Sequence, residues 1–587
     1  MKDIFRFLLG CLFSFVLLLV GNAAVRAQVP DWQMVTAGVN DANAPSFSRT
    51  TGIAMDASGN VYTVGYFDGT ISFGQHTLTS VGSTDIFIVK WSPVTRSYVY
   101  ALQAGGSGRD FAVGIALSGA SIYVCGTTTL GATFGGITIA PGSGSISNSN
   151  VYVAKLTDAG ATANWTWVQQ VQGSAEEYAG GIAVSGSSVY IEGTFLSPTI
   201  GLGPIVLTNT APPSLPYNAF VAKLYDAGSS ASFAWAKVIG GYAQAGTICT
   251  NATTVYVTGV GQNTTTFDNL TLYRPTSPGG FVAKLVDAGS SANWVWVESP
   301  VGFSGFSLFR VGALAPQGAD LYLTGRFAGQ VVLGNTTLTN PAMSANNMQS
   351  DLYVAKLTDA GATAAWQWGL NATGAGDDYG ASVAVRGANV YATGSFNSQT
   401  LTLANQTLML TPGPVRMGLA GDVFVAKLTD TGSSGRVDWA RSAGGNLVDE
   451  GSGVGLGNGV VYVAGTSEPN PDARFGNYFI RGTAQETAFL ASLADPILTA
   501  TTAPLRTETT NLFPNPAHHR ATIQLPALPG IPTATLTLLD ALGRTLRTQT
   551  ALTNANAELD LTGLAPGLYA VRVVAGASTA TQRLVVE

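Results

Sequence analysis

Short runs of alternating hydrophobic and polar residues recur along most of the chain in one fixed order. The clearest run has the form Val-Tyr-x-x-Gly, with Ile or Leu replacing Val in two copies, and it occurs seven times, at 61–65, 122–126, 189–193, 255–259, 321–325, 390–394 and 461–465. A period of two, in a run rich in β-branched and aromatic residues that ends at a turn residue, predicts a β-strand. No helical period appears, so the repeats predict an all-β fold.

Three further runs accompany this strand. One has the form Phe-Val-Ala-Lys-Leu and begins at Phe87, Tyr152, Phe220, Phe281, Tyr353, Phe424 and Phe489; its first copy ends in Trp91, and its last has Ser492 in place of lysine. Another places an aromatic residue six positions before a glycine, with the aromatics Trp32, Tyr100, Trp167, Trp235, Trp296, Trp368 and Trp439. A fourth run opens each unit, as at 52–55. Four short strands per repeat are typical of a β-propeller blade.

The order of the runs predicts how the ring closes. The first tryptophan strand, around Trp32, precedes the first complete unit, and the seventh unit ends at Asp495 without such a strand. We therefore expect residues 28–495 to form a seven-bladed β-propeller of four-stranded blades, whose N-terminal strand completes the last blade. Such closure leaves no open seam in the ring whose unpaired N–H and C=O groups could recruit another chain.

The recurring tryptophans and lysines have two interpretations. Trp165 and Trp167 are two residues apart and share one face of a strand, as do two similar pairs. Repetition in most units favours packing between blades over a sugar-stacking platform. The recurring lysines, which are Lys155, Lys223, Lys284, Lys356 and Lys427, are interpreted as strand-edge or inter-blade partners, because a catalytic lysine would not be needed five times.

The N-terminus has the pattern of a secretory signal peptide at residues 1–27. Lys2 and Arg6 form the charged region, residues 12–20 the apolar region, and Ala27 is the expected cleavage residue. A retained membrane anchor and a lipoprotein signal ending at Cys11 are the alternatives. No later run reaches the roughly 18–20 apolar residues that a spanning helix needs, so the mature chain is expected to be secreted or displayed at the cell surface.

The repeats resemble the secreted bacterial β-propeller repeat family. The residues that carry this resemblance are the strand at 59–65, Gly-Asn-Val-Tyr-Thr-Val-Gly, and the tryptophan strand at 439–445, which ends in Gly-Gly. The resemblance covers about residues 31–495, and the fourth unit departs from it most. It implies the fold and the export of the protein, and it specifies no reaction.

The composition changes at residues 496–510, a Thr/Ala/Pro-rich stretch that reads as a linker. Beyond it, alternating runs at 522–525, 534–539, 557–561, 568–574 and 582–586 predict a small β-sandwich. Residues 511–587 resemble the type IX secretion C-terminal sorting domain of the type A kind, through motifs that contain Pro514, Asn515, Pro516, Gly543, Gly567 and Tyr569. This resemblance implies recognition by the type IX secretion machinery at the outer membrane, followed by release or by attachment to surface polysaccharide.

The composition of the chain excludes several classes of partner and site. With 28 basic and 34 acidic residues the net charge is −6, so nucleic acid is not an expected partner. Charged residues make up only 11% and hydrophobic residues 46%, which excludes a disordered chain and a coiled coil. Cys125 and Cys249 are expected to be buried thiols, and the three histidines are too few for a zinc site or a Ser-His-Asp triad in the repeats. We expect a monomer.

One set of repeated acids is a candidate site. Asp110, Glu177, Asp378 and Asp449 lie four residues after the glycine that ends the third strand, with Glu176, Asp377 and Glu450 beside them. If the following strand is innermost, these acids would ring one mouth of the propeller channel, where they could bind Ca²⁺ or attract cationic ligands. Alternatively, each acid accepts hydrogen bonds from its own turn. No cofactor other than this possible Ca²⁺ is expected, and the identity of any metal stays open.

These observations favour a non-catalytic, exported protein that acts as a binding, adhesion or display scaffold for an extracellular ligand. The alternative is an extracellular hydrolase or lyase, acting on a polysaccharide-type substrate at the acidic mouth. The longest irregular insertions, at 141–150, 208–218 and 412–421, contain mainly Gly, Ser, Pro and Ala. Because they supply almost no reactive side chains, binding is the favoured hypothesis.

Overall fold

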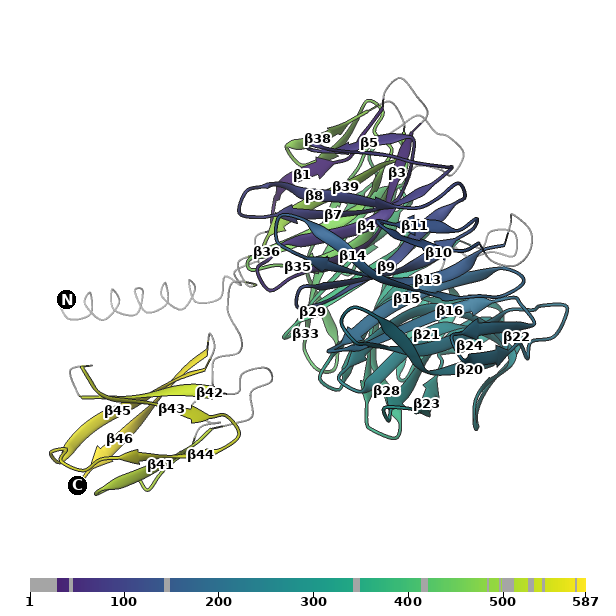
Figure 1. Ribbon diagram of the computed structural model, residues 1–587. Coiled ribbons are helices and arrows are strands. Elements are labelled where there is room, and N and C mark those ends of the chain that lie inside the picture. The colour runs from purple at the N-terminus through teal and green to yellow at the C-terminus, as the bar shows by residue number, and fades with distance from the viewer. Residues whose placement is uncertain are drawn as a thin grey trace, which may run out of the picture. The chain divides into compact units, whose positions relative to one another are not determined.

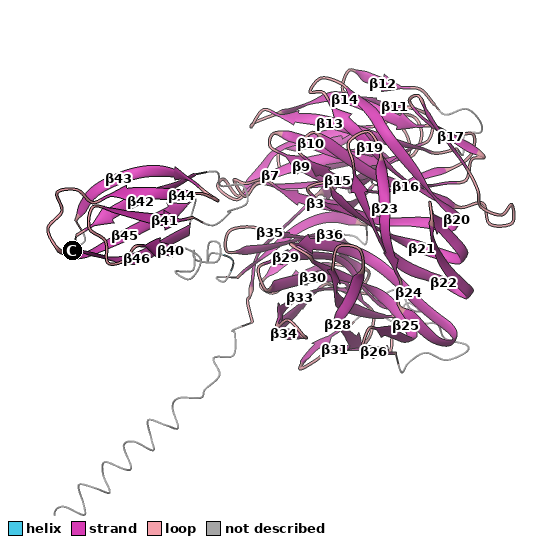
Figure 2. Cartoon of the chain, turned by 90° about the horizontal axis from the view of Figure 1, so that it is seen from below, coloured by secondary structure: helices cyan, strands magenta, loops and turns pink. Residues whose placement is uncertain are grey.

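The computed structural model describes residues 29–41, 46–141, 148–340, 349–412, 421–482, 485–495, 498, 511–525, 533–540, 544–575 and 578–587. The chain divides into two compact units, residues 1–494 and residues 495–587. The predicted signal peptide with Ala27 and nearly all of the predicted linker at 496–510 lie outside the described residues. The described residues contain no α-helix, and Figure 2 shows strands joined by loops in both units, so the protein is all-β.

The first unit is built from successive sets of four antiparallel strands (Figure 1). In chain order the first sets are β3 (Phe47–Met55), β4 (Val61–Asp68), β7 (Asp85–Ser92) and β8 (Ser97–Ala104); β9 (Asp110–Ser118), β10 (Ser121–Thr128), β13 (Asn150–Asp158) and β14 (Ala163–Val171); and β15 (Glu177–Ser185), β16 (Ser188–Phe195), β19 (Asn218–Asp226) and the first half of β20 (Ala231–Asn251). The second half of β20 pairs with β21, so this one long strand ends one set and begins the next.

The later sets continue the pattern. They are the second half of β20 with β21 (Thr254–Phe267), β22 (Leu270–Asp287) and β23 (Ala292–Glu298); β24 (Val301–Gln317), β25 (Asp320–Leu333), β27 (Asp351–Asp359) and β28 (Ala364–Thr373); β29 (Asp378–Arg386), β30 (Asn389–Phe396), β33 (Asp422–Asp430) and β34 (Gly435–Ala443); and β35 (Asp449–Leu456), β36 (Val460–Ser467) and β39 (Thr487–Ala494) with β1 (Trp32–Ala37). The pairing of β1 with β39 places the first described strand beside the last strand of the unit.

Short strands that the sequence analysis missed lie between the second and third strands of most sets. They are β2 (Val39–Asn40) with β5 (Thr70–Phe73) and β6 (His76–Thr79), β11 (Ala132–Phe134) with β12 (Ile137–Ile139), β17 (Thr199–Leu202) with β18 (Ile205–Thr208), β26 (Thr336–Thr339), β31 (Thr400–Leu403) with β32 (Gln406–Met409), and β37 (Asp472–Phe475) with β38 (Tyr478–Arg481). Each run is only two to four residues long, too short to show a reliable period.

The first strand of each set, which we call the inner strand, packs against the inner strand of the next set. The contacts run from β3 to β9, β15, β20, β24, β29 and β35, and β35 packs against β3 again. Within a set, the glycine of the Val-Tyr-x-x-Gly run permits a close approach of the second strand to the inner strand, because a Cβ atom on Gly65 would lie 1.8 Å from the carbonyl oxygen of Arg49. Beside this contact the inner strand β3 has a β-bulge between Thr50 and Gly52.

The recurring lysine and tyrosine are joined to the next set by a buried aspartate. Asp226 Oδ2 accepts hydrogen bonds from Lys155 Nζ at 2.6 Å and from Tyr123 OH at 2.6 Å, while Oδ1 accepts from Trp167 Nε1 at 3.0 Å and from the backbone N–H of Gly228 at 2.9 Å. We call this arrangement the aspartate clasp. It confirms that the recurring lysines and tryptophans connect neighbouring sets.

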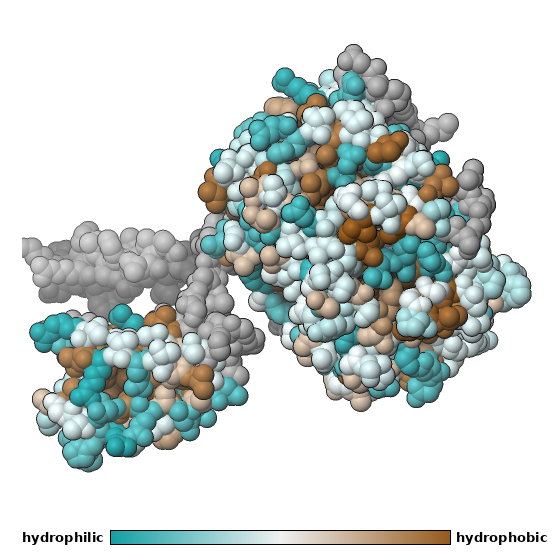
Figure 3. Space-filling model, in the orientation of Figure 1, coloured by the Kyte–Doolittle hydropathy of each residue, from teal (hydrophilic) through white to brown (hydrophobic). Residues whose placement is uncertain are grey.

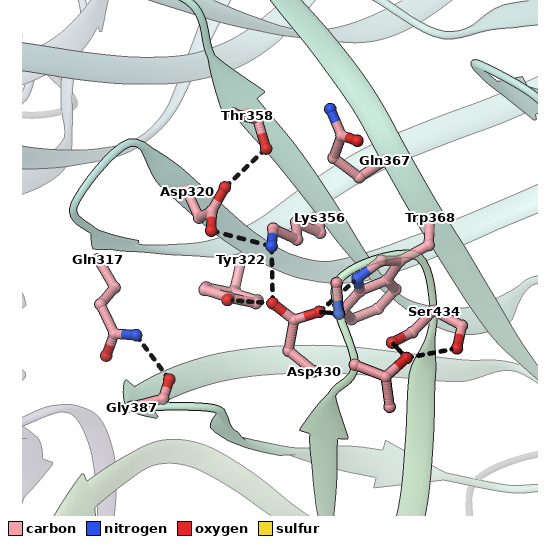
Figure 4. A network of polar contacts seen from close by, with 12 residues as sticks. Gln317, Asp320, Tyr322, Lys356, Thr358, Gln367, Trp368, Gly387, Asp430 and Ser434 are labelled. Atoms are coloured by element: carbon pink, nitrogen blue, oxygen red, sulfur yellow. Dashed lines mark hydrogen bonds and ion pairs between the residues drawn. The ribbon is translucent and has the colours of Figure 1, made fainter. Parts of the chain in front are cut away.

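The clasp repeats along the chain. Its aspartates are Asp158, Asp226, Asp287, Asp359 and Asp430, each of which accepts a lysine and a tyrosine of the preceding set. Figure 4 shows the copy at Asp430, whose carboxylate lies between Lys356, Tyr322 and Trp368. A buried carboxylate that meets a cation and several hydrogen-bond donors fixes the registration of two sheets, because removing either side would leave a buried charge unpaired.

Where the last set meets the first, the clasp is replaced by apolar packing. Pro93 takes the aspartate position, Ser492 the lysine position, and Met34 lies opposite Ser492 where other sets have an aromatic residue. Trp32 therefore lies opposite Leu493, two residues along its strand from the position that its sequence spacing indicated. Trp91 fills the space and contacts Tyr462, with 5.8 Å between the ring centroids.

The C-terminal unit contains two antiparallel sheets. One consists of β40 (Asn511–Phe513), β41 (Arg520–Gln524) and β44 (Asn556–Asp560), and the other of β42 (Thr533–Leu539), β43 (Thr545–Leu552), β45 (Gly567–Ala575) and β46 (Ser578–Val586). Buried residues from both sheets form one apolar cluster that includes Ile523, Leu559, Leu536 and Val573. This unit therefore has its own core, separate from that of the repeats.

Candidate functional site

The four acids that the sequence singled out are fully buried; two accept hydrogen bonds from their own loop, and two accept from the loop that follows the next strand. Asp110 accepts a hydrogen bond from the backbone N–H of Gly106 at 2.7 Å, and Asp449 accepts one from Gly445 at 2.7 Å. Asp378 accepts from Ser398 Oγ at 2.6 Å, and Glu177 accepts from Ser197 Oγ at 2.5 Å. The contacts of Asp110 and Asp449 are the kind expected of turn chemistry, whereas those of Asp378 and Glu177 join two loops of one set.

Burial changes the protonation of these carboxyl groups. Desolvation raises the pKa of Asp110, Glu177 and Asp449 to about 7 and that of Asp378 to about 6, against the lowering effect of their loop hydrogen bonds. Asp110 Oδ1 and Glu177 Oε2 find no hydrogen-bond partner among the described residues. Within the described part of the chain, no three His, Cys, Asp or Glu side chains are grouped so that they could hold a metal ion.

The neighbours of these acids, one residue further along each inner strand, face the other way. Successive side chains on a strand point to opposite faces, so a shift of one residue exchanges a buried position for one turned away from the sheet. The equivalent residues on the inner strands are Arg49, Phe111, Tyr178, Gln244, Arg310, Tyr379 and Glu450, each opposite the residue that follows the motif glycine. We call this set the inner ring.

A hollow of about 740 Å³ opens over the inner ring. Arg49, Phe111, Tyr178, Tyr379 and Glu450 line it, together with hydroxyl-bearing residues that include Thr51, Thr127, Ser149 and Ser452. Of the acids flanking the predicted set, Glu176 and Glu450 therefore face the hollow, whereas Asp110, Glu177, Asp378 and Asp449 do not line it. The alternation within each run indicates which residues share a face of the strand. The bulge beside the motif glycine shifts that alternation by one residue, so the sequence alone did not show which residues face the hollow.

Charges on one side of the hollow are paired. Arg49 forms a two-pronged ion pair with Glu486 and lies 4.0 Å from Glu450. Hydrogen bonding to Glu486 raises the pKa of Arg49, so the guanidinium remains charged. Burial, together with the nearby Glu450, raises the pKa of Tyr379, so its phenol is a hydrogen-bond donor at physiological pH.

Aromatic rings add flat apolar surface to this polar hollow. Tyr66 and Phe111 meet edge to face with 4.8 Å between their centroids, and Tyr178 donates a hydrogen bond to Glu176. A concave site with ring faces, hydroxyl groups and a few charges can hold a polar ligand without any cofactor.

A second hollow, of about 600 Å³, adjoins the first at Tyr379 and Ala381. It is lined by Arg310 and Arg326 and by the small residues Gly312, Gly325 and Gly380. Burial and the nearby Arg326 guanidinium lower the pKa of Arg310. The sequence analysis did not single out either arginine, because the repeat pattern has no fixed residue at these positions.

The sorting-motif residues lie near the C-terminal strand. Asn515 Nδ2 donates to the carbonyl oxygen of Arg583 at 2.6 Å, and its Oδ1 accepts from the N–H of Val585 at 2.9 Å. Pro514 and Pro516 follow cis peptide bonds, Gly567 begins β45, and Tyr569 OH donates to the carbonyl oxygen of Ala565 at 2.7 Å. Gly543 lies outside the described residues.

Comparisons with known proteins bear mainly on this second unit. Residues 511–587 match the family described as Secretion system C-terminal sorting domain. A search of curated proteins found no match. Similar solved structures include a Trypanosoma rangeli sialidase mutant with trans-sialidase activity (9% identity, covering 95% of this chain and 87% of that one, TM-score 0.33) and a Synechocystis apocarotenoid oxygenase mutant (9% identity, 91% and 97%, TM-score 0.31). Drosophila Semaphorin 2a is similar at 7% identity over 95% of this chain and 98% of that one, with a TM-score of 0.23.

TM-scores of this size assign no activity to the chain, but the match of its C-terminal domain identifies its export route. It confirms the sorting domain that the sequence motifs indicated, and with it an interaction with the type IX secretion machinery. Among the described residues no helix is long and apolar enough to cross a membrane. The protein is exported by the type IX pathway, to the cell surface or into the medium, through a C-terminal sorting domain at residues 511–587.

Proposed function

We propose that residues 28–495 form a closed seven-bladed β-propeller in which each four-stranded set is one blade and β1 completes the last. The circular order of contacts between the inner strands supports this architecture, as does the pairing of β1 with β39. Residues 511–587 would form a β-sandwich, since their two sheets share one apolar core.

We further propose that this exported propeller is a non-catalytic binding, adhesion or display scaffold whose ligand is held at the inner ring. The observation that carries this proposal is a contrast between positions. The clasp positions repeat the same residues from blade to blade, as structural positions must, whereas the inner ring presents cationic, anionic and aromatic residues around one hollow. Diverse side chains that converge on one cavity are the usual form of a specific binding site.

The alternative, an extracellular hydrolase or lyase, receives less support from the same residues. Hydrolysis of a glycosidic bond needs two carboxyl groups roughly 5–10 Å apart, one of them able to donate a proton. Glu450 and Glu486 both face Arg49 in ion pairs, so neither is a free acid beside the hollow. On the face that Figure 3 shows, apolar residues lie among polar ones, as is usual for the surface of a folded protein.

The test uses the complete mature chain and a panel of neutral and acidic polysaccharides in affinity gel electrophoresis, with an assay for reducing ends in parallel. We expect one class of polymer to retard the protein while no new reducing ends form. Phe111→Ala should weaken this retardation, whereas Tyr273→Ala, which removes an exposed aromatic ring on β22 that does not line the hollow, should not. New reducing ends that disappear in a Glu450→Gln variant would establish the hydrolase instead.

A further inference from the structure

Two arginines face each other across the inner edge of one sheet. Arg310 on β24 and Arg326 on β25 are direct cross-strand partners. Like charges placed directly opposite each other on a sheet destabilise it, so this pair costs stability in the protein alone. At the equivalent pairs of other sheets the partners are Arg49 with Tyr66, Tyr178 with Thr194 and Tyr379 with Ser395, so the double cation belongs to this sheet.

Neither guanidinium has an acidic partner. Among the described residues, no hydrogen bond or ion pair joins the side chain of Arg310 or Arg326 to another group, in contrast to Arg49 with Glu486. The stretches of 29–495 that the structure leaves undescribed, 42–45, 142–147, 341–348, 413–420 and 483–484, contain no Asp or Glu in the sequence. The titratable groups beside them include the phenol of Tyr242 at Arg310 and that of Tyr379 at Arg326, and burial raises the pKa of both phenols, so they are neutral at physiological pH.

The surroundings of the pair leave room for a ligand. The hollow of about 600 Å³ is lined by both arginines, by Tyr379 and by the glycines Gly312, Gly325 and Gly380, which expose backbone rather than side chains. Two guanidinium groups present parallel N–H donors that match the oxygens of a carboxylate or a sulfate. An oxyanion placed between them would remove the repulsion and supply the missing hydrogen-bond acceptors.

We propose that Arg310 and Arg326 form an anion site that binds the carboxylate or sulfate group of an acidic polysaccharide. This inference rests on the binding function proposed above and names its ligand class. The adjoining hollow supplies what the uncharged part of such a polymer needs, namely aromatic faces at Tyr66 and Phe111 and hydroxyl groups at Thr51 and Thr127. The overall net charge of −6 would repel a polyanion elsewhere on the molecule, so attraction depends on this local pair.

The experiment measures binding of the complete mature chain to polygalacturonate, which carries carboxylates, to dextran sulfate, and to uncharged dextran. We expect at least one acidic polymer to bind, with an affinity that falls as salt rises, and dextran not to bind. The pair Arg310→Gln and Arg326→Gln should weaken binding at least about tenfold. The matched control is Arg474→Gln. It removes a guanidinium on the β37–β38 hairpin whose Cζ lies 5.4 Å from the ring centroid of Phe479. Comparison of the two acidic polymers identifies carboxylate or sulfate as the source of the anion.

A second variant separates loss of the site from loss of the fold. Arg326→Glu would place an acid opposite Arg310 and turn repulsion into attraction, so we expect a higher melting temperature together with loss of polyanion binding. Polyanion binding that survives both substitutions would overturn this inference while leaving the scaffold function intact. Absence of binding to either acidic polymer would also overturn it. Cleavage of the polymer would refute the scaffold function instead.

Discussion

The carboxylate of Asp226 receives four hydrogen bonds in a buried position between two sheets. Asp226→Ala would leave Lys155 buried without its counter-charge and Tyr123 and Trp167 without an acceptor. We expect the free energy of unfolding to fall by about 3–5 kcal/mol, as found when one partner of a buried ion pair is removed. Urea denaturation followed by tryptophan fluorescence measures this change.

A surface ion pair supplies the control for the clasp. Lys237 and Asp268 are 2.8 Å apart but more exposed, and Asp268→Asn, which keeps a residue suited to the positive φ of this turn, should cost less than about 1 kcal/mol. Equal effects of the two substitutions would show that the clasp contributes no more than an ordinary surface pair.

The buried loop acids predict an unusual pH dependence. The pKa of Asp110 and of Asp449 is raised to about 7 in the folded chain, mainly by desolvation, from about 4 in an unfolded chain. A raised pKa contributes stability that is present below the unfolded value and is lost as the pH rises through the folded value. Between pH 5 and pH 8 the melting temperature should therefore fall, and Asp110→Asn, which keeps an acceptor for Gly106, should be more stable than the natural chain at pH 8 by on the order of 2 kcal/mol. A flat profile in the natural chain would contradict this account.

The same acids test the calcium hypothesis. Because each is engaged in hydrogen bonds with loop residues and no three acidic side chains gather in the described regions, we expect thermal melts in EDTA and in millimolar Ca²⁺ to coincide. A calcium site of the extracellular type, with Ca²⁺ at about 100 times its Kd, would add about 2.7 kcal/mol to the free energy of unfolding. A calcium-dependent shift that disappears in Asp378→Asn would restore these residues as a cation site.

At the scale of the strand, sequence periodicity was enough to place the elements but not to decide which side chains face the hollow. The Val-Tyr-x-x-Gly and Phe-Val-Ala-Lys-Leu runs coincide with paired central strands such as β10 and β13. The acids at the start of each inner strand were harder to place, because a bulge beside the motif glycine changes the local parity. One residue of difference separates the buried Asp110 from Phe111, which lines the hollow.

Two departures from the clasp pattern occur at the same junction. Ser492 replaces the clasp lysine in the last set, and Pro93 replaces the clasp aspartate in the first set, which it faces. Ser492→Lys would bury a cation with no acceptor at this junction, and we expect the free energy of unfolding to fall by about 3 kcal/mol. Ser492→Ala should be nearly neutral. In the double variant Ser492→Lys with Pro93→Asp, recovery of part of the loss is expected in urea denaturation, and a double variant worse than either single change would refute the correspondence.

For the whole molecule, the repeats and the sorting motifs could be read from sequence because each recurs or occurs in a fixed order. The ligand could not, because the inner ring takes its residues from strands far apart in the chain, at an equivalent position whose residue type the repeat pattern does not fix. Arg49, for example, pairs with Glu486, a contact between the first set and the last that depends on how the chain closes. Such a site becomes visible only when the inner strands are brought together.

Closure of the ring of strand sets depends on β1. Strand β1 pairs with β39, and Arg441 on β34 holds the residues before it by hydrogen bonds to the carbonyl oxygens of Val29 and Pro30. A mature chain that begins at residue 41 would expose the edge of β39, and an open edge recruits strands from other molecules. We expect concentration-dependent association in size-exclusion chromatography. A synthetic peptide of residues 29–40 should restore the monomer by adding back the missing strand, whereas the same peptide with Val35→Pro, which cannot donate a backbone hydrogen bond at that position, should not. A truncated chain that stays monomeric and melts like the natural one would show that β1 is dispensable and that the ring closes by packing of the inner strands alone.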